Sequence, residues 1–548
     1  MSRSSSTAEP RTLLHLLAAT SVVSGLSTAA GETPIAGGAA LLLDGLAWAA
    51  KSSSGQRVPA QVPGDIISDL ARAGLIADPW KNLTWREHAG LWDTHSWNFT
   101  VSFPTPPAWA RSGGATLLVF DSVKMAGDIN LNSVVLGAAT SQHLRYTYDV
   151  SNWLVSSAAA VNTLTVSFPP TVSDTRNDFG RFQGCSGGWD WAPYSNETTG
   201  RTPNGIRTMS KGLVKSVYLT HTRPSNVFIT AVKPLVTYRG AYPQEPLTDV
   251  TAGGWRVDVM VYLQAPASSG TPAEGTLHVT SAWGDELSVP IRGLAAGAGE
   301  IAVNASLAVE AGVVRLWWPN TMSSIRPLYA INVSFTPILE GEPAVVASSR
   351  VGFRTIALVT ADDSDPSKLA GVPGNGVLTM RLKVNGADLS ARGANWIPLE
   401  ELNARATDVA HAAAVASAAA AGMSILRIWG GGLYPCEAFL AAADVAGVLL
   451  FVDAMYASQG DSHHFATDTA EQRAELVYNV RRMAPHPCVA VYDGASDFPA
   501  LIFPTSTSTY SPYSCADCRH QPTFDLQTLT NCVTAYTQHA TNVAAQAQ

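Results

Sequence analysis

An apolar run that ends in three consecutive glycines constrains the fold of this chain more than any other feature. It spans residues 424–434 and reads Ser-Ile-Leu-Arg-Ile-Trp-Gly-Gly-Gly-Leu-Tyr. Such a run is typical of a buried strand, and the glycines predict a loop whose backbone adopts conformations that other residues reach only at a cost. The alternative is a merely flexible loop, which is the usual explanation for a lone triple glycine.

The segments around this run alternate between helical and strand patterns. Residues 404–422 are rich in alanine, residues 437–446 form a shorter helical stretch, and residues 448–452 are a second apolar run followed by Asp453. Alternating helices and strands predict a parallel sheet, and parallel α/β folds collect functional groups at the carboxyl ends of their strands. Trp429 and Asp453 therefore stand at positions where a site is expected.

The residues before this part show a different periodicity. Residues 30–222 contain short alternating runs separated by turn residues, which predict an all-β sandwich. Residues 223–358 show the same alternating pattern over a length typical of an immunoglobulin-like sandwich. Residues 359–378 are rich in Gly, Pro, Asp and Ser and predict a linker, and residues 379–548 carry the βα pattern.

The N-terminal residues 1–29 have the pattern of a secretory signal peptide. Arg3 and Arg11 precede the apolar stretch 13–19, and small residues that suit cleavage follow. No later stretch is long and apolar enough to span a bilayer, so we expect a secretory or extracellular protein with no membrane contact after signal removal. Five Asn-X-Ser/Thr sequons agree with secretion, at Asn82, Asn98, Asn196, Asn304 and Asn332.

Composition narrows the classes of partner. Lys plus Arg number 35 against 43 Asp plus Glu, and no basic run occurs, which argues against nucleic acid and anionic membranes. The 15 Trp are enough to supply sugar-stacking platforms, although most Trp fill cores. The Cys515 and Cys518 pair has redox or metal spacing, but no second pair or His cluster accompanies it, so a local disulfide or free thiols is favoured. We expect no metal and no cofactor, and the oligomeric state is left open.

Several short motifs occur in order along most of the chain. They are Val-Pro-Gly-Asp (62–65), Gly-Trp-Asp-Trp-Ala-Pro (188–193), Trp-Trp-Pro (317–319), Gly-Phe-Arg-Thr (352–355), Gly-Ala-Asn-Trp-Ile-Pro (393–398) and Leu-Arg-Ile-Trp-Gly-Gly-Gly (426–432). Together they resemble roughly the first three-fifths of a β-mannosidase of glycoside hydrolase family 2. The resemblance implies a jelly-roll, galactose-binding-like β-sandwich, an immunoglobulin-like β-sandwich and a (β/α)8 TIM barrel.

The barrel of this chain is expected to be incomplete. Four strands are predicted, near residues 388–395, 424–429, 447–452 and 488–492. A closed (β/α)8 barrel takes eight strands and about 250 residues. The resemblance implies an exo-acting enzyme that hydrolyses terminal, non-reducing β-D-mannose residues of oligosaccharides or glycoproteins with retention. Its partner would be a small oligosaccharide substrate, and the resemblance implies an acidic, lysosome-like compartment.

The resemblance also implies sugar-contacting residues in the first sandwich. Asp190 lies between Trp189 and Trp191 and would accept hydrogen bonds from the hydroxyls of mannose. The alternative is an Asp that caps a turn at a Trp-rich sandwich edge.

Further substrate-binding residues are implied in the barrel. Asn395 and Trp396 resemble the sugar-contacting pair of the family, and Trp429 ends the next strand. The alternative for Trp396 is a core residue beside a turn Asn. Arg427 would hold a catalytic carboxylate ionised through charge-assisted hydrogen bonds, and its alternative is a structural ion pair with Asp453.

Retaining hydrolysis needs two carboxylates about 5–5.5 Å apart. The acid/base position of the family falls on Asp497 rather than Glu, which retracts the carboxyl group by about 1.5 Å, one C–C bond. Ser496 replaces the Asn that would hold the 2-hydroxyl. No motif similar to Ser-Glu-Tyr-Gly, which would carry the nucleophile, follows Asp497. A non-catalytic mannose-binding or vestigial relative is therefore the second interpretation.

Overall fold

The structure is a computed structural model. It describes residues 32–81, 84–155, 161–170, 180–183, 210–241, 243, 245–267, 272–359, 381–455 and 470–493. Several predictions fall outside these residues: the signal peptide, nearly all of the linker, and the candidate residues Asn82, Trp189, Asp190, Trp191, Asn196, Ser496 and Asp497. No described helix is long and apolar enough to cross a membrane.

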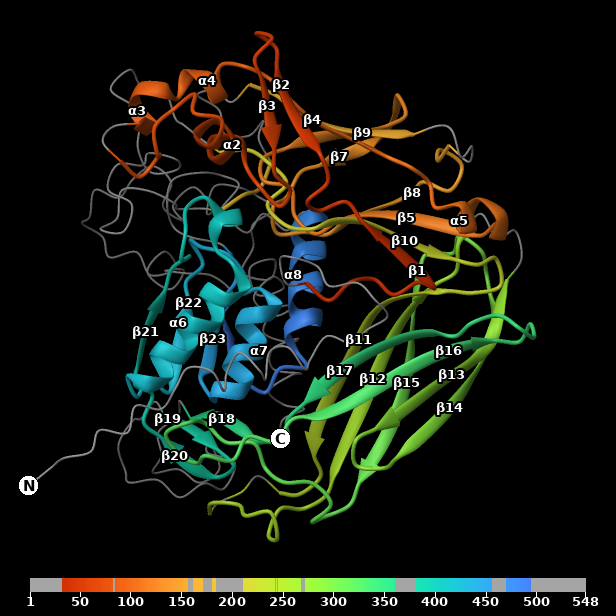
Figure 1. Cartoon of the computed structure of the whole chain (residues 1–548). Helices are drawn as coiled ribbons and strands as arrows, with labels where there is room; N and C mark the ends of the chain where they lie inside the picture. The colour runs from red at the N-terminus through yellow and green to blue at the C-terminus, as the bar shows by residue number, and fades with distance from the viewer. Residues whose placement is uncertain are drawn as a thin grey trace, which may run out of the picture.

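The first part of the chain forms two packed antiparallel sheets, drawn in red and orange in Figure 1 except for β10, which is yellow. One sheet has the order β3-β2-β4-β9-β6-β7 and the other has the order β1-β10-β5-β8. The strands are β1 (Ala39–Leu42), β2 (Trp48–Ser52), β3 (Arg57–Ala60), β4 (Trp97–Phe103), β5 (Ala115–Phe120), β6 (Gly127–Leu131), β7 (Val134–Ala139), β8 (Tyr146–Asp149), β9 (Asn162–Phe168) and β10 (Val217–Thr222). This architecture agrees with the predicted β-sandwich.

Short helices join some of these strands. They are α2 (Ile66–Arg72), α3 (Thr84–His88), α4 (Gly90–Asp93) and α5 (Pro107–Ser112). Asp65 caps the start of α2, because its side chain accepts a hydrogen bond from the Ser68 amide.

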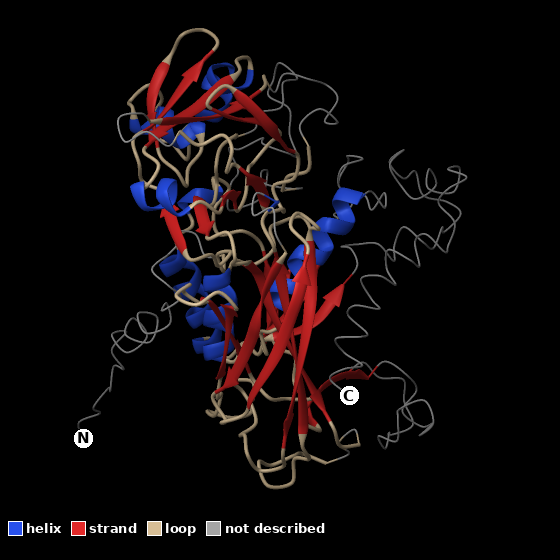
Figure 2. Ribbon diagram, turned by 90° about the vertical axis from the view of Figure 1, so that its right-hand side faces the viewer, coloured by secondary structure: helices blue, strands red, loops and turns tan. Residues whose placement is uncertain are grey.

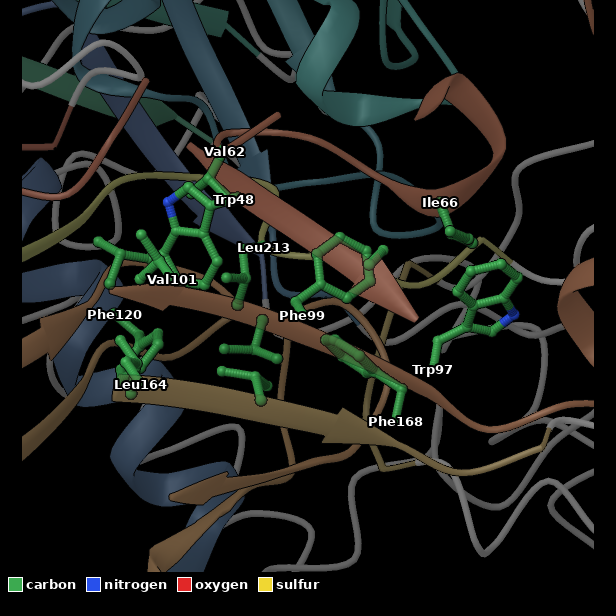
Figure 3. Packing of buried hydrophobic residues seen from close by; sticks show 14 of the residues in the cluster. Trp48, Val62, Ile66, Trp97, Phe99, Val101, Phe120, Leu164, Phe168 and Leu213 are labelled. Carbon is green, nitrogen blue, oxygen red and sulfur yellow. The ribbon is translucent and has the colours of Figure 1, made fainter. Parts of the chain in front are cut away.

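Alternation along the strands creates the core of this sandwich. In β4 the residues at alternate positions from Trp97 to Phe103 are buried, which points their side chains to one face. Figure 3 shows Phe99 and Val101 of this strand near Trp48 and Leu164 from neighbouring strands.

The second part is also a two-layer sandwich, drawn in yellow and green in Figure 1 and lying below the first in Figure 2. Its sheets have the orders β11-β12-β15 and β14-β13-β16-β17. The strands are β11 (Phe228–Tyr238), β12 (Trp255–Gln264), β13 (Ala273–Ser281), β14 (Glu286–Leu294), β15 (Glu300–Val309), β16 (Tyr329–Pro337) and β17 (Val345–Val351). The second predicted sandwich is thus present.

A small antiparallel sheet, β18-β19-β20, leads into the third part. Its strands are β18 (Ile356–Val359), β19 (Arg381–Val384) and β20 (Ala387–Leu389). The sequence pattern did not predict this sheet. Because β18 pairs with β19, residues just before the predicted boundary at 358/359 join the third part by hydrogen bonding. The domain limits themselves stay a prediction.

The third part carries four parallel strands in the order β21-β22-β23-β24. They are β21 (Gly393–Trp396), β22 (Ile425–Ile428), β23 (Leu449–Asp453) and β24 (Val489–Asp493), with helices α6 (Asp408–Ala420), α7 (Glu437–Ala446) and α8 (Ala470–Met483), and a 3-10 turn η3 (Asn403–Arg405). The described residues therefore hold the parallel strands expected of an incomplete barrel.

Helix α8 connects the three parts of the molecule. Figure 1 shows it in blue, beneath the first sandwich and beside the second. Arg481 of α8 lies over the ring of Tyr262 in β12 at 3.6 Å from its centroid, and it forms an ion pair of 2.6 Å with Glu300. The helix thus fixes the parallel sheet against the second sandwich.

Candidate active site at the carboxyl ends of the parallel strands

The polar residues predicted at the strand ends lie on one face of the parallel sheet. Asn395 of β21 is paired in register with Arg427 of β22, and Asp453 of β23 is paired with Asp493 of β24. Asp453 lies two residues beyond Phe451, the register partner of Arg427, so its side chain points to the same face. The sheet therefore gathers one cation, one amide and two carboxylates at its carboxyl edge.

Arg427 and Asp453 form a bidentate ion pair. The Nη2 atom of Arg427 lies 2.7 Å from Oδ2 of Asp453, and Nε donates to Oδ1 at 3.2 Å. Nη1 donates to Oδ1 of Asn395 at 3.3 Å. The side chain of Asp453 is fully buried, whereas that of Arg427 keeps 32% of its exposure. The pair predicted as the structural alternative is present, and its cation also reaches the open face.

Burial controls the charge of Asp453. It raises the pKa of this carboxyl group to about 6, against the lowering effect of Arg427. The neighbouring Asp493 raises the pKa further, and the Gly430 amide, which donates to Oδ2 at 3.1 Å, lowers it. A carboxyl group with this pKa changes its protonation near the pH of an acidic compartment.

The triple glycine is required for space rather than for unusual backbone angles. None of Gly430, Gly431 and Gly432 has a positive φ, so the structure does not show here the left-handed backbone that favours glycine. A Cβ atom at Gly431 would instead lie 2.2 Å from the indole of Trp429, and one at Gly432 would lie 3.0 Å from Pro398. The loop therefore folds under the Trp429 ring, which only a residue without a side chain permits.

Trp396 and Trp429 lie in different surroundings. Trp396 packs against Phe439 of α7 with ring centroids 4.7 Å apart, which places it on the helix-covered face opposite Asn395. This position matches the core alternative for Trp396. Trp429 is half-buried, and its amide donates to the Trp396 carbonyl at 3.2 Å. The proposed sugar contacts of both residues stay predictions.

A second cluster of polar residues lies at the amino ends of the same strands. Ligand atoms of Asp444, His486 and Cys488 lie within 4.8 Å of one another, and all three residues are buried. His486 Nδ1 already contacts Asp444 Oδ2 at 2.6 Å, and the Cys488 amide donates to Asp444 Oδ1 at 3.0 Å. Because these groups satisfy one another, we interpret the cluster as structural rather than as a metal site.

The first sandwich matches a known family model. Residues 48–202 match the glycosyl hydrolase 2 galactose-binding domain-like family. This match covers six strands of the first sheet and the predicted Trp-Asp-Trp segment.

Whole-chain comparisons extend the similarity beyond this part. The chain is 25% identical over 499 residues to a β-mannosidase of Rattus norvegicus, covering 85% of this chain and 50% of that protein. Among solved structures, it resembles a β-D-mannosidase of Dictyoglomus thermophilum with a TM-score of 0.63 and 20% identity, covering 83% of this chain and 52% of that one. An exo-chitosanase of Amycolatopsis orientalis has a TM-score of 0.61 at 16% identity, covering 83% and 49%.

These relatives are longer than the chain. It spans about half the length of the curated β-mannosidases that it matches. The structural neighbours match most of this chain at low identity, which supports its fold. Over most of its length, the chain is thus a β-mannosidase-like relative of the glycoside hydrolase 2 type.

Proposed function

We propose that this chain supplies the sugar-binding end of a glycoside hydrolase that removes terminal, non-reducing β-D-mannose residues from oligosaccharides with retention. The observation that carries the proposal is the Arg427–Asp453 pair at the carboxyl edge of the parallel sheet, in a chain related to β-mannosidases. Charged groups that are partly exposed at such an edge are suited to binding the hydroxyl groups of a sugar.

Asp453 and Arg427 have different roles in the pair, and both roles suit a sugar site. Asp453 is buried and holds the guanidinium of Arg427 in a fixed plane, with Asn395 on its other side. Arg427 then faces solvent with donors in a defined orientation. Asp190, Trp189 and Trp191 complete the proposed subsite from the first sandwich, and Trp396 and Trp429 are proposed to border it.

The chemistry requires an acid/base and a nucleophile. We propose Asp497 for the acid/base position, with Ser496 beside the 2-hydroxyl. Because Asp497 is one methylene shorter than the Glu of the family, we expect the 548-residue chain to bind mannose but to turn over an aryl β-mannoside poorly or not at all.

A non-catalytic mannose-binding role is the second candidate. It is favoured by Asp497, which stands where the resembling family has Glu. A carboxyl group misplaced by about 1 Å can lower a rate roughly a hundredfold. Binding would survive this change, because affinity depends on residues around the sugar rather than on the proton donor.

Calorimetric titration of the folded chain with mannose tests the proposal, with galactose as the control sugar. We expect Arg427→Lys to weaken mannose binding about tenfold, because Lys cannot form the bidentate contact that Arg427 makes with Asp453. Asp190→Ala should weaken it roughly ten- to a hundredfold. Equal affinities for the parent and both variants would contradict the assignment of this edge. Turnover of an aryl β-mannoside that Asp497→Ala abolishes would contradict the non-catalytic role.

The proposed compartment is the secretory pathway. Asn98, Asn304 and Asn332 are exposed on strands β4, β15 and β16, where a glycan would extend into solvent. Expression in a secretory host followed by glycosidase treatment should lower the mass of the protein. An unchanged mass would contradict this assignment.

A further inference from the structure

Two short segments of the first sandwich lie across the carboxyl edge of the parallel sheet. We define the strap as residues 140–143 together with residues 180–183. Ser141 and Arg181 form a parallel bridge between the two segments. The Arg181 amide donates to the Thr140 carbonyl at 2.6 Å, and the Gln142 amide donates to the Arg181 carbonyl at 2.7 Å.

A glycine allows this close approach. Gly180 has a φ of +70°, and a Cβ atom there would lie 2.1 Å from the Thr140 carbonyl oxygen. The two segments of the strap are therefore in direct backbone contact, which makes it a rigid unit.

The strap contacts the segment that follows β21. Gln142 donates to the side-chain oxygen of Asn403 at 2.7 Å, and Asn403 donates to Gln183 at 2.9 Å. The Gln142 side chain also accepts a hydrogen bond from the Gln183 backbone amide at 3.0 Å, so these three residues form a closed network. Asn403 is thereby held to both segments of the strap.

The strap also contacts the segment that follows β22. The rings of His143 and Tyr434 meet edge to face, with centroids 5.6 Å apart. Tyr434 comes directly after the triple glycine and Leu433, so its position fixes the far end of the loop that carries Trp429.

Arg181 reaches the segment that follows β23. Its Nη2 atom donates to the Met455 carbonyl at 2.6 Å, two residues after Asp453. The same guanidinium makes two contacts with Glu475 of α8, one of them 2.7 Å long. Both side chains are almost fully buried, at 3% and 0% exposure. A buried planar guanidinium with fixed acceptors has little freedom to move.

Glu475 links these contacts into one network. Its carboxylate accepts hydrogen bonds from Tyr434 at 3.4 Å and from Ser141 at 3.2 Å. The Met455 amide donates to the Tyr434 hydroxyl at 3.3 Å. The segments after β22 and β23 are therefore tied to each other and to the strap through Arg181 and Glu475.

We propose that Arg181 is a positioning residue, which uses the strap to hold the segments after β21, β22 and β23 and thereby fixes the orientation of Asp453 and Trp429. The first sandwich thus acts as a template for the carboxyl edge in addition to any sugar contact that it makes. The effect on sugar affinity rests on the proposed function, whereas the effect on local order does not.

Arg354 offers a matched control for Arg181. It is a half-buried Arg that likewise donates to backbone carbonyls, those of Pro487 and Val489, but these lie at the amino end of β24. Arg181→Lys and Arg354→Lys make the same chemical change at opposite ends of the sheet. A purely structural role for Arg181 would make the two variants alike.

Hydrogen–deuterium exchange by mass spectrometry separates the two roles. Peptides covering residues 426–434 and 450–456 contain the Gly430 amide, bonded to Asp453, and the Met455 amide, bonded to Tyr434. We expect exchange in both peptides to rise about tenfold in Arg181→Lys and to stay unchanged in Arg354→Lys, because local opening sets the exchange rate. Exchange that stays unchanged in Arg181→Lys, or that rises equally in both variants, would overturn the proposal.

Tyr434→Phe keeps the experiment decisive if Arg181→Lys does not fold. It removes only the hydroxyl that joins Glu475 to Met455, and the proposal expects faster exchange in the 450–456 peptide. Unchanged exchange there would contradict the proposal. Mannose affinity is measured in parallel, and we expect about a tenfold loss in Arg181→Lys alone. A parent chain that does not bind mannose would refute the proposed function, and the exchange comparison would still decide the role of Arg181.

Discussion

The two ends of the parallel sheet carry similar residues in different surroundings. At the carboxyl end, buried Asp453 pairs with Arg427, whose side chain keeps 32% of its exposure. At the amino end, buried Asp444 pairs with His486, which is itself only 9% exposed. Both ends therefore hold a buried Asp with a cationic partner, but only one partner faces an open side of the sheet.

The pKa values of the buried groups also distinguish the two ends. Burial lowers the pKa of His486, but Asp444 and Glu437 together raise it to about 10. Burial raises the pKa of Asp453 to about 6 despite its partner. The amino end is thus a closed ion pair that stays charged at neutral pH, whereas the carboxyl end titrates in a mildly acidic range. An ion pair is a candidate functional site when one member remains accessible and titratable.

Removing Asp444 should have the largest effect on stability. Asp444→Ala leaves His486 buried beside Glu437 alone and frees the Cys488 amide. We expect the free energy of unfolding to fall by about 3–5 kcal/mol in urea titrations, because a buried charge loses its partner. Asp453→Ala should cost less, since solvent reaches Arg427. A larger loss in Asp453→Ala than in Asp444→Ala would contradict the comparison.

The pH dependence of the amino end follows from His486. Its pKa in the folded chain lies above the unfolded value, so its stabilising contribution is complete below about pH 6.5 and is lost as the pH rises towards 10. The difference in unfolding free energy between the parent and His486→Gln should therefore shrink by roughly 3–5 kcal/mol across this window. A constant difference from pH 6.5 to 10 would show that His486 is not held as a cation.

The stability contributed by the carboxyl end should change in a lower pH range. Here burial raises the pKa of an acid, whereas at the amino end acidic partners raise the pKa of a base. The folded pKa of Asp453 is raised, so the folded chain binds a proton more tightly than the unfolded chain does. The stability of the parent relative to Asp453→Asn should fall by roughly 1–3 kcal/mol as the pH rises from about 4 through 6. Thermal melting over this range measures it, and a relative stability that rises instead would mean that Arg427 outweighs burial.

Two glycines extend the comparison to the backbone. Gly447 at the end of α7 has a φ of +74°, and a Cβ atom there would lie 2.7 Å from the Asn320 backbone nitrogen, whereas a Cβ atom at Gly431 would meet the Trp429 side chain. Gly447→Ala should lower the unfolding free energy by about 2 kcal/mol or more without changing mannose affinity. Gly431→Ala should displace the Trp429 ring and change mannose affinity more than stability. If instead Gly431→Ala lowered the melting temperature more and Gly447→Ala changed mannose affinity more, the sugar site would not be at the carboxyl end.

Periodicity predicted the parallel sheet closely. The helix expected at 437–446 is α7, and three of the expected strands are β22 to β24 with shifted ends. The strand expected near 388–395 was wrong as one element, because these residues are divided between β20 of the antiparallel sheet and β21 of the parallel sheet. These elements have apolar runs or strong helix propensity, which are local properties of the sequence. The role of the glycines was not predictable in the same way, because the sequence does not distinguish a need for space from a need for a positive φ.

Helix α8 and the strap were missed for a different reason. The buried residues of α8 include Val480 and Met483 near its end, but before them the buried face carries Gln472, Glu475 and Asn479, which are residue types typical of a solvent-exposed face. The partner of Glu475 is Arg181, 294 residues earlier in the chain. A polar helix face can be recognised as buried only when its partner is known, and no local pattern in the sequence connects the two residues.

Cys488 provides the smallest expected effect and tests how closed the amino end is. Its thiol is fully buried and donates to the Leu440 carbonyl at 3.6 Å. Burial, with Asp444 nearby, raises the pKa of the thiol well above its usual range, which disfavours the reactive thiolate. Cys488→Ser should therefore change the unfolding free energy by about 1 kcal/mol or less, since a hydroxyl can donate to the same carbonyl. In the native parent, mass spectrometry after treatment with a thiol reagent should find Cys488 unmodified, and full modification should appear only in denaturant. Rapid labelling of Cys488 under native conditions would show that the amino end opens, and it would remove the contrast between a closed and an accessible ion pair.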